Sequence, residues 1–88
     1  MKVVVIYRPN SDHGRLTEEF IHDFQRLHPD QKVETLNVDS RDGSATATLY
    51  DVVQYPTILV LQTDGQIEKS WAGEILPRID EVIGYARL

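Results

Sequence analysis

The chain has 88 residues, no cysteine and a formal net charge of -5. A chain of this length forms one domain, so residues 1–88 are interpreted as a single unit. The absence of cysteine excludes a disulfide framework, a thiolate metal site and a redox thiol. The acidic balance argues against nucleic acid as a partner, because phosphate contacts need clustered lysine and arginine.

No apolar run approaches the ~20 residues that a membrane helix needs. The apolar stretch after Lys2 is too short for a signal peptide. We therefore expect a cytoplasmic protein without membrane contact, whose oligomeric state the sequence leaves open.

The first elements are a strand and a helix. Lys2 to Tyr7 is a continuous, mostly β-branched run, typical of a central strand buried on both faces. A helix is predicted from Asp12 to Leu27, with Ser11 or Asp12 as its N-cap and Pro29 shortly after its end. Its apolar face is expected to consist of Leu16, Phe20, Phe24 and Leu27, with Ile21 beside them.

A second strand and a second helix follow. Residues 32–38 alternate between apolar and polar side chains, which predicts a strand parallel to the first, reached by a right-handed crossover. Asp42 is the expected N-cap of the helix after it. The apolar side of that helix is expected to consist of Ala45, Leu49, Val52 and Val53.

The chain then turns at Pro56 into a strand from Thr57 to Leu61. Proline cannot donate to a sheet ladder, so Pro56 must lie where this strand begins. The X-Pro bond is the one type for which a cis peptide costs little, and we expect a cis bond before Pro56. Asp64-Gly65 predicts a hairpin, and residues 67–71 predict a short edge strand.

A closing helix ends the chain. Pro77 is predicted to lie in its first turn. Gly84 inside the helix costs up to about 1 kcal/mol relative to alanine. The side chains expected to face the sheet are Ile79, Val82, Ile83 and Ala86.

The order β-α-β-α-β-β-α, with a proline before the third strand, resembles the thioredoxin fold. This resemblance implies an α/β domain with a four-stranded mixed sheet flanked by three helices. The extra N-terminal strand and helix of a full thioredoxin are missing. The matching positions are Asn37-Val38-Asp39, Tyr50, Tyr55-Pro56-Thr57, Asp64-Gly65 and Ala72-Gly73.

The chain departs from thioredoxins where their chemistry takes place. The position of their Cys-x-x-Cys motif reads Ser11-Asp12-His13-Gly14, and their buried carboxylate falls at Val5. A low-pKa thiolate is the nucleophile of disulfide exchange, whereas serine stays protonated at neutral pH. Thiol-disulfide oxidoreductase activity is therefore excluded, and we predict no cofactor.

The resemblance also implies a shallow groove beside the first helix. If Pro56 is cis, the main chain of Tyr55 is free to pair with an extended peptide, and Tyr7 and Trp71 are candidate aromatic anchors. We therefore predict a protein- or peptide-interaction module. The alternative is that Tyr7 and Trp71 are half-buried sheet residues and that nothing binds. The predicted groove residues are Asn10, Ser11, Asp12, Gln54, Tyr55, Pro56, Ala72 and Gly73.

Catalysis has a weaker basis in the sequence. Ser11, Asp12 and His13 are suitable residue types for a nucleophile and a base, but adjacent residues at a helix start point in different directions. Helix capping explains Ser11 and Asp12 more simply. We therefore predict no catalytic residue.

A metal site has a similarly thin basis. Glu18 or Glu19 forms a pair with His22 on one helix face, but three or four ligands are needed and His28 lies too far along the helix. A solvated charged face explains the pattern, and we predict no metal site.

In size and element order the chain also resembles the N-terminal domain of glutathione transferases. Such domains hold glutathione against the residue before the cis-proline and use a tyrosine or serine near the end of the first strand. Tyr7 and Ser11 stand near those places, but the acidic-serine pair after the hairpin is interrupted by Lys69. Glutathione or small-thiol binding is therefore the alternative function.

Overall fold

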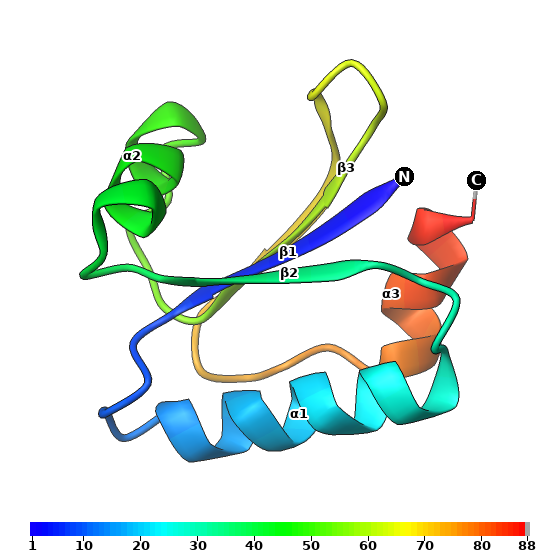
Figure 1. Cartoon of the computed structure of the whole chain (residues 1–88), viewed down its shortest axis with the longest axis horizontal. Coiled ribbons are helices and arrows are strands. Elements are labelled where there is room, and N and C mark those ends of the chain that lie inside the picture. Colours follow the sequence, from blue (N-terminus) through cyan, green and yellow to red (C-terminus); the bar gives the residue numbers. More distant parts are fainter. Residues whose placement is uncertain (88) are drawn as a thin grey trace.

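A computed structural model of the chain describes residues 1–87 (Figure 1). The element order β-α-β-α-β-β-α predicted from the sequence is confirmed. The elements are β1 (Lys2–Tyr7), α1 (Gly14–Leu27), β2 (Val33–Asn37), α2 (Arg41–Leu49), β3 (Thr57–Leu61), β4 (Ile67–Ala72) and α3 (Ile79–Ala86).

The four strands form one mixed sheet in the order β2-β1-β3-β4. β1 pairs parallel with β2 and antiparallel with β3, which in turn pairs antiparallel with β4. β1 and β3 are the central strands, and their continuous apolar runs are buried on both faces, as predicted. β4 is an edge strand and ends one residue later than predicted.

The helices cover both faces of the sheet (Figure 1). α1 and α3 pack on one face, against a core that includes Val3, Val5, Ile58 and Val60. α2 packs on the other face, against a core that includes Val4, Ile6, Leu59 and Leu61. No helix among residues 1–87 combines the length and the apolar character needed to cross a membrane.

The buried side of α1 differs from the predicted one. Leu16 and Leu27 are 60% and 53% exposed, whereas Thr17 is fully buried. The Thr17 hydroxyl donates to the His13 carbonyl oxygen at 2.8 Å, which satisfies its polar atom inside the core. The helix therefore buries Thr17, Ile21 and Phe24, with Phe20 partly buried beside them.

The start of α1 also differs from the prediction. Neither Ser11 nor Asp12 is the N-cap: His13 occupies that position, without a capping hydrogen bond from its side chain. A Cβ atom on Gly14 would overlap the carbonyl oxygen of Pro9, so the helix begins where its backbone lies directly against the preceding loop. Only glycine allows this approach.

α2 is capped by Ser40 and not by Asp42. The Ser40 hydroxyl oxygen accepts a hydrogen bond from the Gly43 amide at 2.9 Å. A Cβ atom on Gly43 would overlap the Asn37 carbonyl oxygen, so this side of the helix lies against the end of β2.

The predicted apolar side of α2 is therefore largely wrong. Ala47, one turn after Gly43, is buried, while Ala45 is exposed and Leu49 is 72% exposed. Beyond the helix, Val52 packs against the core, but Val53 is 84% exposed.

The hairpin between β3 and β4 forms as predicted. Gly65 has a φ of 90°, and its amide donates to the Gln62 carbonyl oxygen at 2.9 Å. α3 begins at Ile79 with Arg78 as its N-cap, so Pro77 precedes the helix and does not lie in its first turn. Its buried side chains, Val82, Ile83 and Ala86, are among those predicted, and Ile79 is partly buried.

Candidate functional site

The Arg8–Gly14 loop, which contains the predicted position of the Cys-x-x-Cys motif at Ser11–Gly14, is closed by hydrogen bonds within itself. The Arg8 amide donates to Nε2 of His13 at 3.2 Å, and the Ser11 hydroxyl donates to the Arg8 carbonyl oxygen at 2.5 Å. The Gly14 amide donates to the Ser11 carbonyl oxygen at 3.1 Å. Because the Ser11 proton points to a carbonyl group and not to the imidazole, no nucleophile–base pair is formed.

The Tyr55–Pro56 junction lies between two well-anchored segments. The Tyr55–Pro56 peptide bond is cis, and Pro56 is buried. The Pro56 carbonyl oxygen accepts from the Gly73 amide at 3.0 Å, and the Thr57 hydroxyl donates to the Gln54 carbonyl oxygen at 2.6 Å. Within residues 1–87, neither the amide nor the carbonyl group of Tyr55 itself has a hydrogen-bond partner.

The Tyr55 side chain is held in place by the α2 core, by Val52 of its own loop and by Arg8 of the loop after β1. It is half-buried against the α2 core, and its hydroxyl lies 3.5 Å from the Val52 carbonyl oxygen. The Arg8 guanidinium lies 5.7 Å from the centre of the Tyr55 ring, a distance at which cations and aromatic faces attract. The ring is therefore fixed, while the main chain of Tyr55 keeps its polar groups free.

Arg8 is itself fixed by Asp39. Two hydrogen bonds join the guanidinium to the Asp39 carboxylate, at 2.9 Å from Nε and 3.1 Å from Nη2. These bonds raise the pKa of Arg8 and lower the pKa of Asp39, because each charge stabilises the other. Both partners are solvent-exposed, so this pair orients Arg8 more than it stabilises the fold.

The two candidate anchors, Tyr7 and Trp71, differ in their surroundings. Tyr7 is only 8% exposed, and its hydroxyl donates to Oε2 of Glu18 at 3.0 Å. Burial raises the pKa of Tyr7, and the Glu18 carboxylate raises it further. Trp71 is half-buried and packs edge-on against Tyr85, with ring centres 5.7 Å apart. Tyr7 therefore offers little surface to a partner, and Trp71 packs on α3.

Three of the predicted groove residues line hollows in the structure: Asp12 lines one, and Gln54 and Ala72 line another. The structure has two hollows near them, without a shared lining residue. The first, which we call the Asp12 hollow, has a volume of about 110 Å³ and is lined by Asp12, His13, Leu16, Thr17, Glu74 and Leu76. The second, the Gln54 hollow, has a volume of about 130 Å³ and is lined by Tyr50, Asp51, Val52, Val53, Gln54, Thr57, Leu59, Ile67, Ser70 and Ala72.

Of the six residues that line the Asp12 hollow, only Asp12 is among the predicted groove residues; the others are His13, Leu16, Thr17, Glu74 and Leu76. Leu16 was assigned to the core because of its helical spacing, although it is 60% exposed. Glu74 and Leu76 lie in the irregular segment after β4, where no periodic pattern marks them. The only usable signal was their position directly after Ala72-Gly73.

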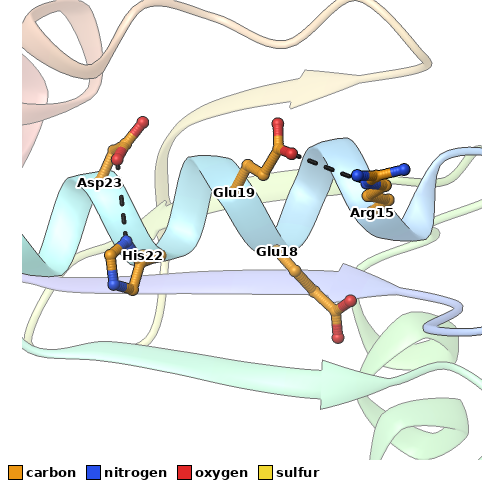
Figure 2. Close-up of a pocket in the computed structure, with 5 residues that line it drawn as sticks. All are labelled: Arg15, Glu18, Glu19, His22 and Asp23. Atoms are coloured by element: carbon orange, nitrogen blue, oxygen red, sulfur yellow. Dashed lines mark ion pairs between the residues drawn. The ribbon is translucent and has the colours of Figure 1, made fainter.

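Helix α1 carries the residues considered for metal binding, and they point to different sides of it (Figure 2). Glu19 pairs with Arg15 at 3.8 Å, and Nδ1 of His22 lies 3.8 Å from Asp23. Glu18, which accepts the Tyr7 hydroxyl, points to the side of the helix opposite to Glu19 in Figure 2. Among residues 1–87 no group of three or more His, Cys, Asp or Glu side chains is placed to hold a metal ion.

The strand order, the helices on both faces and the proline turn before β3 define a thioredoxin-like fold, in a chain without cysteine. A scan against models of protein families gives no match, and a search of curated proteins gives none either. Solved structures do match. Thioredoxin 1 of Thermosipho africanus is similar with a TM-score of 0.71 and 18% identity, over 99% of this chain and 91% of that one.

Two eukaryotic thioredoxins are similar to the same degree. Oxidised mitochondrial thioredoxin 3 of Saccharomyces cerevisiae matches with a TM-score of 0.71 and 17% identity, over 98% of this chain and 76% of its own. Oxidised thioredoxin O2 of Arabidopsis thaliana matches with a TM-score of 0.72 and 15% identity, over 98% of this chain and 71% of its own. At these identities the likeness establishes the fold alone, and the predicted fold class is confirmed.

Proposed function

We propose that this chain is a redox-inactive thioredoxin-like domain that binds an extended segment of another protein at Tyr55. The observation that carries the proposal is the main chain of Tyr55, whose amide and carbonyl groups lack partners within residues 1–87. An extended peptide forms strand-like hydrogen bonds to such free groups. The residues on either side of Tyr55 are anchored by hydrogen bonds: Gln54 is bonded to Thr57, and Pro56 is bonded to Gly73. The segment is therefore already ordered, and binding costs it little conformational entropy.

Binding is favoured over chemistry by the surroundings of Tyr55. The chain has no cysteine, and the serine and histidine of the Arg8–Gly14 loop use their polar atoms to close that loop. A binding role needs none of these groups.

The location of the protein in the cytoplasm stays a prediction from the sequence.

Glutathione binding is the weaker alternative. A site of that kind needs a free hydroxyl near the end of β1, whereas the hydroxyls of Tyr7 and Ser11 donate to Glu18 and to the Arg8 carbonyl. The raised pKa of Tyr7 also disfavours the phenolate form. No observation in the site favours a thiol ligand over a peptide.

The proposal is tested by affinity capture followed by NMR. The intact domain is compared with Tyr55→Pro, which lacks the backbone amide proton, and with Lys32→Ala, an exposed control. We expect a protein that is retained by the domain and by the control but not by Tyr55→Pro. Circular dichroism establishes that each variant is folded.

A second readout does not depend on any variant. Hydrogen exchange at the Tyr55 amide of the unchanged domain should slow when the captured segment is bound. Equal capture by Tyr55→Pro, together with unchanged exchange at Tyr55, would refute the proposal. Saturable NMR shifts at Tyr55 and Ser11 with reduced glutathione alone would favour the alternative.

A further inference from the structure

The Asp12 hollow is linked to the Tyr55 junction through neighbouring residues of the chain. Glu74 follows Gly73, whose amide binds the Pro56 carbonyl oxygen, and Asp12 follows Ser11 in the Arg8–Gly14 loop. In Figure 1 the connection from β4 to α3 runs alongside the first half of α1, and the two segments together line the hollow. A segment that leaves Tyr55 along this side therefore meets the hollow next.

The size and lining of the hollow suit a single apolar side chain. Its volume of about 110 Å³ is well below the roughly 300–1,000 Å³ of pockets that enclose small-molecule ligands. Leu16 and Leu76 form apolar parts of its wall, and Leu16 is 60% exposed. Ile75, between the lining residues Glu74 and Leu76, is 92% exposed and adds apolar surface nearby.

The rim of the hollow is negatively charged and uncompensated. Asp12 and Glu74 are exposed, and neither takes part in an ion pair within residues 1–87. The arginines nearest in the chain are already paired: Arg8 with Asp39, Arg15 with Glu19 and Arg78 with Asp80. An unpaired acidic rim attracts a basic partner and repels an acidic one.

We infer that the segment bound at Tyr55 is basic and apolar: one aliphatic side chain enters the Asp12 hollow, and an adjacent lysine or arginine pairs with Asp12 and Glu74. This inference rests on the proposed function and adds the chemical class of the partner. The acidic rim makes the site prefer a basic segment over an acidic one, and the apolar side chain fixes where the segment lies. A second copy of this chain is a poor occupant, because its own net charge is -5.

The test uses two synthetic peptides with the same apolar centre, Gly-Lys-Leu-Val-Lys-Gly and Gly-Glu-Leu-Val-Glu-Gly. Their binding to the 88-residue domain is followed by NMR shifts of the Tyr55 and Leu16 amides. We expect the lysine peptide to bind about three- to tenfold more tightly, from two exposed charge pairs. The difference should shrink at high salt, because exposed charges are screened.

Charge reversal supplies the matched control. In Asp12→Lys/Glu74→Lys the preference should change to the glutamate peptide. In Asp30→Lys/Asp42→Lys, which changes the net charge equally at remote exposed positions, the preference for lysine should remain.

The possible failures can be told apart. If Asp12→Lys/Glu74→Lys still prefers the lysine peptide while the Tyr55 amide shifts, the inferred charge preference is wrong and the proposed function stands. If neither peptide shifts Tyr55 or Leu16, the inferred partner is wrong, and the capture and hydrogen-exchange experiments decide the proposed function. If these amides shift with protein concentration in the absence of peptide, a second copy occupies the hollow, and the inferred partner is wrong.

Discussion

Replacing Gly14 with alanine is expected to destabilise the protein because the new methyl group meets backbone on one side. It would lie 2.7 Å from the Pro9 carbonyl carbon and 2.9 Å from the Arg8 carbonyl oxygen, and it would overlap the Pro9 carbonyl oxygen. Backbone atoms cannot rotate away as a flexible side chain does. The Arg8–Gly14 loop or the start of α1 must therefore move.

The expected cost is about 2 kcal/mol, within the range of about 1–3 kcal/mol for overpacked sites. In a domain of this size, each kcal/mol shifts Tm by about 4–8 °C, so Tm should fall by roughly 10 °C. Urea unfolding followed by the fluorescence of the single tryptophan measures the free energy of unfolding.

Gly84→Ala is the matched control. Gly84 also lies in a helix, but a Cβ atom there has no neighbour within 4 Å among the described residues. Alanine should therefore stabilise α3 by about 0.5–1 kcal/mol through helix propensity alone. The steric argument fails if Gly14→Ala and Gly84→Ala change the free energy of unfolding in the same direction.

Three further outcomes are expected. Tyr7→Phe should lower the free energy of unfolding in urea by about 1 kcal/mol, because a half-buried hydrogen bond to α1 is lost; an unchanged value would contradict this. Ser40→Ala should cost about 1 kcal/mol and Asp42→Ala less, since Ser40 is the N-cap, and the reverse order in thermal unfolding would refute the assignment. The pKa of Asp39, followed by NMR, should lie below the ordinary value of an aspartate and rise in Arg8→Ala, because the Arg8 guanidinium is what lowers it. Because folding lowers the pKa of Asp39, the ion pair of Asp39 with Arg8 stabilises the folded protein above about pH 4, and this stabilisation is lost as the pH falls through the folded-state pKa. An Asp39 pKa that Arg8→Ala leaves unchanged would show that Arg8 does not lower it.

The strands could be predicted because their sequence pattern has one interpretation. Val3–Tyr7 and Ile58–Leu61 are continuous apolar runs, and a central strand covered on both faces buries every residue of such a run. The Asp64-Gly65 pair likewise indicates a tight hairpin, since its turn needs a positive φ. From these elements and their order the fold follows.

The helix faces could not be predicted equally well. Side-chain size favoured Leu16 in α1 and Leu49 in α2, yet both are exposed. In α2 the close approach of Gly43 to the end of β2 decides which face turns inward, and it buries the small Ala47. In α1 a threonine enters the core because a carbonyl one turn earlier accepts its proton. Both effects depend on where the backbone atoms lie, and the spacing of apolar residues in the sequence does not give these positions.

The candidate site could be predicted only in its outline. The sequence places Asp12 and Gln54 beside the Tyr55–Pro56 turn, but it cannot tell that they line different hollows. Between Ala72 of one hollow and Glu74 of the other lies Gly73, with a φ of 104° and its amide bonded to the Pro56 carbonyl oxygen. The separation of the two hollows therefore depends on the path of the backbone after β4, which the order of residue types does not predict.

The polar groups at the candidate site differ in whether they already have hydrogen-bond or ion-pair partners, and this difference supports the proposed function. Ser11 and His13, in the segment that resembles the position of the thioredoxin Cys-x-x-Cys motif, use their side chains to close a loop. Within residues 1–87 the main chain of Tyr55 has no hydrogen-bond partner, and the carboxylates of Asp12 and Glu74 form no ion pair. Main-chain groups recognise an extended backbone, and exposed carboxylates recognise a cation. The partner that we propose, a basic extended segment, would satisfy both kinds of group.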